Sequence, residues 1–109
     1  MGEDLLDENL DRVIRALYPK FQIIVMSGRS EDCRNITATW LTDMGVQYDE
    51  LHMRPSRDIR PHTIIKYELF DEYVRGRFNI TCVYDDRSSV VQLWRRMGLS
   101  CYQVAPGNF

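Results

Sequence analysis

Apolar runs alternate with amphipathic segments along the chain, in the order expected of strands and helices. The stretch FQIIVM, residues 21–26, is a continuous apolar run rich in β-branched residues, and NITCVY, residues 79–84, is a second. Such runs are typical of strands buried on both faces of a parallel sheet. A shorter strand is predicted over residues 100–104, and an extended piece over residues 48–53.

Four other segments have the spacing of apolar positions that is typical of helices. They cover residues 9–17, 30–43, 62–74 and 88–97, and glycines at positions 45 and 98 are well placed to end the second and the fourth. Strands and helices that alternate with short connections predict an α/β fold with a parallel, doubly wound sheet. With 109 residues, we expect a single domain over residues 1–109.

Composition narrows the class of protein without identifying it. Hydrophobic residues make up 44% of the chain and the formal net charge is −2, as in an ordinary globular protein. No apolar run approaches the roughly 20 residues that a membrane span requires, so no membrane association is expected. The three cysteines are far apart and show no CxxC spacing, which favours neither disulfides nor zinc. We therefore expect a reducing, cytoplasmic setting.

Polar residues follow both of the long predicted strands, where open parallel sheets bind their ligands. Ser27-Gly28-Arg29 follows the first strand, and its hydroxyl, its glycine and the N–H groups of a helix start would suit a phosphate oxygen. The same tripeptide also suits a turn that caps a helix. Asp85-Asp86 follows the second strand, and a divalent cation would relieve the repulsion of adjacent carboxylates. Alternatively, Asp86 caps the next helix while Asp85 is solvated.

A third polar segment is the loop HMRPSRDIRP, whose two prolines argue against regular structure. It carries Arg54, Arg57 and Arg60, and arginines bind phosphate through paired hydrogen bonds. The carboxylate of Asp58 would orient an arginine, or contact a sugar or a water molecule on a metal. The alternative is a solvated loop of charges.

The three segments occur in an order that resembles a known family. VMSGR is followed by HMRPxxDxR, by a helix containing IIKYELF, and by VYDDRxxVVxxWRxMGLxCxQVAxGxF. This order closely resembles the phosphatase domain of polynucleotide kinases. These are haloacid-dehalogenase-type enzymes of phage-like nucleic-acid repair that remove 3′-phosphates from DNA or RNA ends. The resemblance covers Phe21 to Phe109 and implies a Rossmann-like core, a parallel sheet with helices on both faces.

The resemblance also implies which residues form the site. Ser27 would bind the phosphate, and Lys66 would neutralise charge, although a solvated or ion-paired helix lysine is the commoner case. The whole phosphate- and substrate-binding set would be Ser27, Gly28, Arg29, Arg54, Asp58, Arg60 and Lys66. The ligands of Mg²⁺ would be Asp85 and Asp86.

The family's nucleophile has no counterpart in this sequence. It lies in a DxDGT-like motif on the family's first strand, where one aspartate attacks phosphorus and a second acts as acid and base. None of the ten aspartates of this chain stands in a D-x-D pair. We therefore expect no catalytic residue, a first central strand that is missing or replaced, and no hydrolysis by the chain alone.

The loop departs from the family's pattern as well. Where the family has a G-D-x-R-K-like run, this chain reads Arg57-Asp58-Ile59-Arg60-Pro61. Pro61 stands where a lysine is usual, and it cannot neutralise phosphoryl charge, on which phosphoryl transfer depends. Because the nucleophile motif is missing, Mg²⁺ would also lose a ligand, and it is expected to be held weakly.

Three functions remain open on these grounds. The favoured one is a binding or inhibitory module for a nucleic-acid 3′ end, a nucleotide or a protein. The second is a Mg²⁺-dependent polynucleotide 3′-phosphatase whose nucleophile motif comes from another chain or an upstream segment. The third is a structural assembly subunit. A central strand contributes a large part of a domain's stability of about 5–15 kcal/mol. We therefore also expect a partner protein, or a homo-oligomer such as a dimer, to fill the gap.

Overall fold

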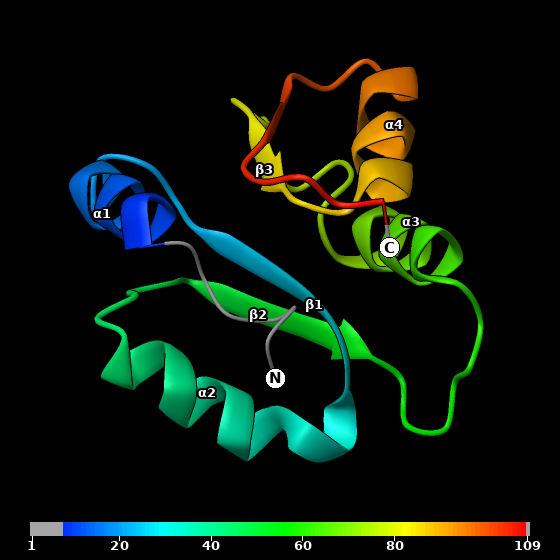
Figure 1. Cartoon of the computed structure of the whole chain (residues 1–109), viewed down its shortest axis with the longest axis horizontal. Coiled ribbons are helices and arrows are strands. Elements are labelled where there is room, and N and C mark those ends of the chain that lie inside the picture. The colour runs from blue at the N-terminus through cyan, green and yellow to red at the C-terminus, as the bar shows by residue number, and fades with distance from the viewer. Residues whose placement is uncertain (1–7, 109) are drawn as a thin grey trace. The chain divides into compact units, whose positions relative to one another are not determined.

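A computed structural model of the chain describes residues 8–108, which divide into two compact units after Arg57 (Figure 1). The N-terminal unit ends at Arg57 and the C-terminal unit begins at Asp58. No helix among the described residues is long and apolar enough to cross a membrane. Among the described residues, each unit contains one pair of parallel strands and two α-helices.

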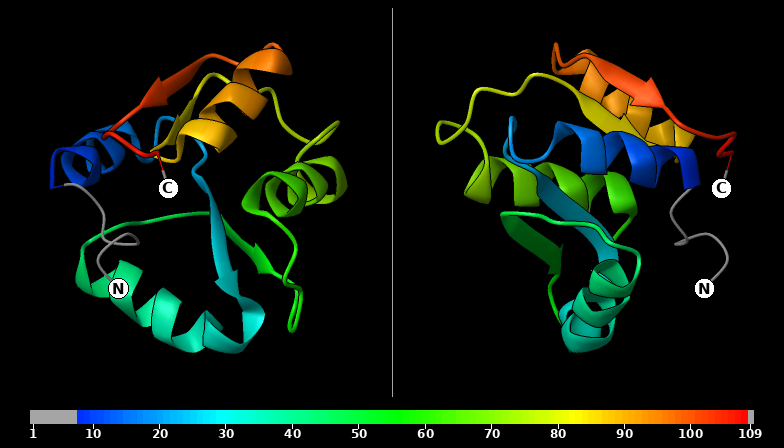
Figure 2. Two further views of the ribbon diagram at one scale, coloured as in Figure 1. Left: turned by 45° about the vertical axis from the view of Figure 1, so that its right-hand side comes forward. Right: turned by 90° about the vertical axis from the view of Figure 1, so that its left-hand side faces the viewer.

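The N-terminal unit consists of α1 (Glu8–Leu17), β1 (Ile24–Ser30), a 3-10 turn η2 (Glu31–Cys33), α2 (Arg34–Asp43) and β2 (Glu50–Arg54). Strands β1 and β2 run parallel, and α2 lies alongside them (Figure 2). Helix α2 ends as predicted at Gly45, whose φ of +78° is the left-handed conformation that favours glycine.

The core of the N-terminal unit forms between α2 and β2. Alternate residues of β2 point inward, because side chains along a strand alternate between its two faces. The buried side chains are those of Leu41, Val46, Leu51 and Met53. The opposite face of β2 carries the polar side chains of Glu50, His52 and Arg54, which are half-buried.

The C-terminal unit consists of α3 (His62–Tyr73), β3 (Val83–Asp85), α4 (Ser88–Arg96) and β4 (Cys101–Gln103). Strands β3 and β4 are parallel, and α4 packs against both of them (Figure 2). The rings of Phe70 on α3 and Trp94 on α4 lie 5.6 Å apart. The most completely buried side chains are those of Ile65, Val74, Val90 and Val91.

The predicted α/β fold with parallel strands is confirmed, whereas the limits of its two long strands are wrong. The first strand begins at Ile24 instead of Phe21, and it continues through the Ser-Gly-Arg segment that was expected to be a turn. The N–H of Phe21 bonds the carbonyl of Leu17 at the end of α1, so this residue belongs to the helix end. Every residue of β1 is only half-buried.

The second long strand is shorter than its apolar run. Strand β3 begins at Val83 rather than Asn79, because only its last residues have a partner in β4. The strands expected over residues 48–53 and 100–104 are found as β2 and β4, shifted or shortened by one to two residues. Short apolar runs predict that a strand exists, but the pairing partner decides where it ends.

Candidate functional site

The Ser-Gly-Arg segment lies where the regular pairing of β1 with β2 breaks. Ser27 pairs with Met53, and the next paired positions are Ser30 and Arg54, so two residues of β1 stand outside the ladder. These two are Gly28 and Arg29. The backbone N–H of Arg29 donates to the Ser27 hydroxyl oxygen at 3.1 Å. The break therefore gathers a hydroxyl and irregular backbone at the carboxyl end of the strand.

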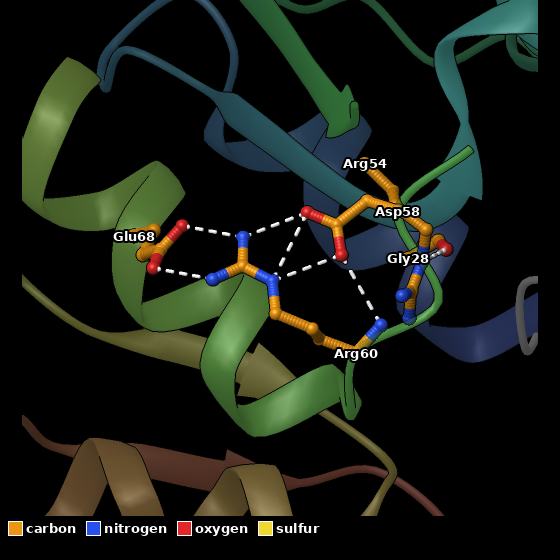
Figure 3. Close-up of polar contacts among 5 residues, drawn as sticks. All are labelled: Gly28, Arg54, Asp58, Arg60 and Glu68. Carbon is orange, nitrogen blue, oxygen red and sulfur yellow. Dashed lines mark hydrogen bonds and ion pairs between the residues drawn. The ribbon is translucent and has the colours of Figure 1, made fainter. Parts of the chain in front are cut away.

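Arg54 ties the end of β2 to this irregular segment. Its Nε donates to the carbonyl oxygen of Gly28 at 2.8 Å (Figure 3). The side chain is partly buried, which fixes its guanidinium beside the backbone of Gly28 and Arg29. The structure thus brings together Ser27, Gly28, Arg29 and Arg54, as expected from the sequence.

A second contact holds the loop that follows β2. The hydroxyl of Ser56 lies 2.8 Å from both carboxylate oxygens of Asp32 in the η2 turn. Asp32 in turn bonds Ser30, whose hydroxyl accepts from the Asp32 N–H at 3.1 Å. Ser30 therefore caps the η2 turn. Asp32 and Ser56 were not predicted from the sequence, because no local pattern pairs residues 24 positions apart.

Between these contacts and the next helix, Arg57 adopts an unusual backbone conformation. Its φ is +65°, and it is the only non-glycine residue with positive φ among the described residues. The resemblance places a glycine of the family at this position, and glycine adopts such angles without steric cost. In this chain the left-handed position carries a charged side chain instead, which is exposed.

Asp58 and Arg60 form a separate group with Glu68 of α3 (Figure 3). The Arg60 guanidinium donates to both oxygens of Asp58, at 2.7 and 2.9 Å, and to both oxygens of Glu68, at 2.7 and 2.8 Å. These hydrogen bonds raise the pKa of Arg60 above its ordinary range and lower the pKa of Glu68. Arg60 is thus engaged by two carboxylates, which ties its loop to α3.

Asp85 and Lys66 are brought together at the end of β3. The Lys66 ammonium donates to Asp85 Oδ2 at 3.0 Å, and the indole N–H of Trp94 donates to the same oxygen at 3.1 Å. The other oxygen, Oδ1, accepts from the backbone N–H groups of Asp86 and Arg87, at 2.9 and 3.3 Å. The two side chains are 7% and 13% exposed, so this is a buried ion pair with four donors around one carboxylate.

Asp86 does not cap α4, and Asp85 is not solvated, so the alternative interpretation of this pair is wrong. The residue at the helix cap is Arg87, and it makes no capping hydrogen bond through its side chain. The Asp86–Arg87 backbone is instead covered by the C-terminal tail. A Cβ on Gly107 would lie 1.7 Å from the carbonyl oxygen of Asp86, and the N–H of Ser88 donates to the Gly107 carbonyl at 2.7 Å. Only glycine fits there.

The expected magnesium ligands do not form a metal site by themselves. Both oxygens of Asp85 already accept hydrogen bonds from protein donors. Among residues 8–108 there is no group of three or more histidine, cysteine or acidic side chains that could hold a metal ion. Of the two, only Asp86 presents a carboxylate without a hydrogen-bond partner among residues 8–108, and Mg²⁺ normally needs further oxygen ligands.

Comparisons with known proteins identify the family of the chain. The family model of the polynucleotide kinase PNKP phosphatase domain matches residues 1–109. A protein of Autographa californica nuclear polyhedrosis virus, named as a bifunctional polynucleotide kinase/RNA ligase, is 39% identical over 74 residues. That match covers 67% of this chain but only 11% of the viral protein.

Solved structures show the same fold. A chain of a Pnkp1/Rnl/Hen1 complex matches 96% of this chain with 36% identity and a TM-score of 0.92. A chain of the Pnkp1/Rnl/Hen1 RNA repair complex matches 98% of it with 37% identity and the same TM-score. This chain spans 37% and 35% of those two chains. Because the family model matches residues 1–109, this chain belongs to the family of the polynucleotide kinase PNKP phosphatase domain.

Proposed function

We propose that this chain provides the phosphate-binding part of a polynucleotide 3′-phosphatase site and, as it stands, binds phosphate-bearing ends without hydrolysing them. The observation that carries the proposal is the break in the β1 ladder. It gathers the Ser27 hydroxyl, the irregular backbone of Gly28 and Arg29, and the Arg54 side chain. A hydroxyl, backbone N–H groups and guanidinium groups are the donors that proteins use to bind phosphate oxygens.

We expect binding without hydrolysis because no carboxylate of the described residues is suited to be the nucleophile. No D-x-D pair occurs in the sequence, so a nucleophile would have to be another acidic residue. Asp85 is unsuited to attack phosphorus, because four donors stabilise its carboxylate and occupy both of its oxygens. Phosphoryl transfer also requires charge neutralisation, and two of the expected contributors, Arg60 and Lys66, are already paired with carboxylates.

Magnesium has a limited place in this proposal. Asp86 is the side chain that would meet a metal ion, and Mg²⁺ would supply charge neutralisation when bound. With one available carboxylate, the ion must take most of its ligands from water. We therefore expect weak Mg²⁺ binding.

A partner that adds a strand is also part of the proposal. Within residues 8–108 the strands form two separate pairs, so β1 and β3 are each bonded along one edge only. An open edge presents unpaired N–H and C=O groups that another strand satisfies. A partner protein or a second copy of the chain is the expected source. A well-folded monomer in light scattering at micromolar concentration would count against it.

A second candidate function is a complete 3′-phosphatase whose nucleophile comes from another chain or an upstream segment. The observation in its favour is the retained Lys66–Asp85 pair, since a buried ion pair is costly to keep without a use. The relatives are also much longer than this chain, which spans 11% to 37% of them. Phosphate release by the chain only after addition of a D-x-D-bearing segment would favour this function.

Binding by the purified chain tests the main proposal. Fluorescence anisotropy would compare an oligonucleotide with a 3′-phosphate and the same oligonucleotide with a 3′-hydroxyl. We expect tighter binding of the phosphorylated end, and a loss of that preference in Arg29→Ala. Arg12→Ala, which removes an exposed arginine of α1, is the matched control and should bind like the wild type. Equal affinity of the wild type for both ends would refute the proposal.

A further inference from the structure

The three arginines of the loop between β2 and α3 differ in what their side chains contact. Arg54 bonds the carbonyl of Gly28, and Arg60 is held by two carboxylates. Arg57 is exposed, and its side chain has no polar contact or ion pair with any residue that the structure describes. Of these three guanidinium groups, that of Arg57 is the one with no partner among the described residues.

The residue before Arg57 holds the backbone of this part of the loop in place. Ser56 is fixed by its two contacts to Asp32, at 2.8 Å each. The φ of +65° at Arg57 is sterically unfavourable for any residue with a Cβ, and glycine, asparagine or aspartate are the usual occupants. Strained residues of this kind gather at ligand-binding sites, where the strain orients a side chain.

We infer that Arg57 contacts a second phosphate of a polynucleotide, the one that neighbours the terminal phosphate bound at the β1 break. This inference rests on the proposed function and extends it to the class of ligand: a strand of several nucleotides rather than a single nucleotide. Arg57 follows Arg54 by three residues, which limits their backbone separation to roughly 10 Å. Phosphates follow one another along a strand at a rise of about 3.4 Å in a helix, so a neighbouring phosphate lies within reach.

The chemistry of the residue fits this role. A phosphate of the backbone is singly charged and exposed, and arginine binds it through paired hydrogen bonds without base specificity. The contact would strengthen binding of any sequence and would weaken as salt is added, because counterions are released from the nucleic acid. Arg57 thus makes the affinity depend on the length of the nucleic-acid strand, and it is distinct from the residues that bind the terminal phosphate.

The experiment compares two ligands over a series of salt concentrations: a single-stranded oligonucleotide with a 3′-phosphate, and a nucleoside 3′-monophosphate. For Arg57→Gly we expect several-fold weaker oligonucleotide binding. We also expect a salt slope of log K that is smaller by about 0.7, the value for one phosphate contact of a single strand. Affinity for the mononucleotide should not change. Arg57→Lys should restore the slope, and Arg57→Asn is a second neutral variant that tolerates the left-handed backbone.

The possible results separate the inference from the proposed function. An unchanged salt slope in Arg57→Gly and Arg57→Asn would overturn the inference, while wild-type binding of phosphorylated ends would leave the proposed function standing. An equal loss for the mononucleotide would overturn it too, since Arg57 would then contact the terminal phosphate. Wild-type protein that binds neither ligand would refute the proposed function, and the inference would fall with it.

Discussion

Replacing Lys66 by methionine should destabilise the C-terminal unit, because it would leave the Asp85 carboxylate buried without its cation. The two side chains are 13% and 7% exposed, and their charged atoms lie 3.0 Å apart. Removing one partner of a fully buried pair costs about 3–5 kcal/mol. In the variant, three other donors would still bond Asp85. In the wild type, Lys66 is in part exposed to water, so the pair is not fully buried. We therefore expect a loss of about 2–3 kcal/mol.

Urea unfolding followed by tryptophan fluorescence would measure this loss. Trp94 donates to Asp85, so its emission reports on the same region of the C-terminal unit. Lys20→Met is the matched control, since Lys20 is the only other lysine of the chain and is exposed. That substitution should change the free energy of unfolding by no more than about 0.5 kcal/mol.

A double-mutant cycle with Asp85→Asn isolates the pair itself. If the ion pair is the cause, Lys66→Met should cost much less in the Asp85→Asn background, with a coupling energy of about 1–3 kcal/mol. If Lys66→Met behaves like Lys20→Met, the ion pair does not stabilise the C-terminal unit. A cycle with no coupling would show that the loss comes from packing of the lysine side chain instead.

Three further predictions concern single residues. Arg57→Gly should raise the free energy of unfolding by about 0.5–1 kcal/mol, because relief of left-handed strain exceeds the added chain entropy, and an unchanged urea midpoint would contradict this. Burial, reinforced by the charge of Asp85, raises the pKa of the Cys101 thiol, so iodoacetamide at about pH 8 should modify it more slowly than the half-buried Cys82. The hydrogen bond from Arg60 lowers the pKa of Glu68, so the stability it contributes is present at neutral pH and lost as pH falls through the folded pKa. Glu68→Gln should remove this dependence, and identical unfolding profiles of variant and wild type over roughly pH 3–5 would contradict it.

The helices could be predicted closely, because their signals lie within each segment. The helices expected at residues 62–74 and 88–97 are found as His62–Tyr73 and Ser88–Arg96, and Gly98 ends the last one with a φ of +87°. Strand limits could not be predicted in this way. The run beginning at Phe21 forms regular pairing only from Ile24, since the position of a strand depends on a partner elsewhere in the chain.

The candidate site was predictable as a set of residues, but not as a set of contacts. The sequence indicated Lys66 and Asp85 separately, whereas the structure pairs them across 19 positions. It indicated Arg60 as a phosphate ligand, whereas two carboxylates hold its guanidinium. Such pairing depends on which side chains the fold brings together, and no local pattern reveals it. Gly107 could have been suspected from its place in the family-like tail, but only the close approach of Asp86 explains it.

Phosphate release by this chain alone is the most direct test of the proposed binding without hydrolysis. The purified protein, in excess over an oligonucleotide with a labelled 3′-phosphate, would be incubated with Mg²⁺, and free phosphate would be followed alongside binding. We predict that the labelled end is bound and that no phosphate is released above the level seen with Asp85→Asn. Release by the wild type that Asp85→Asn abolishes would contradict it, and would mean that a nucleophile within these 109 residues reaches the phosphate.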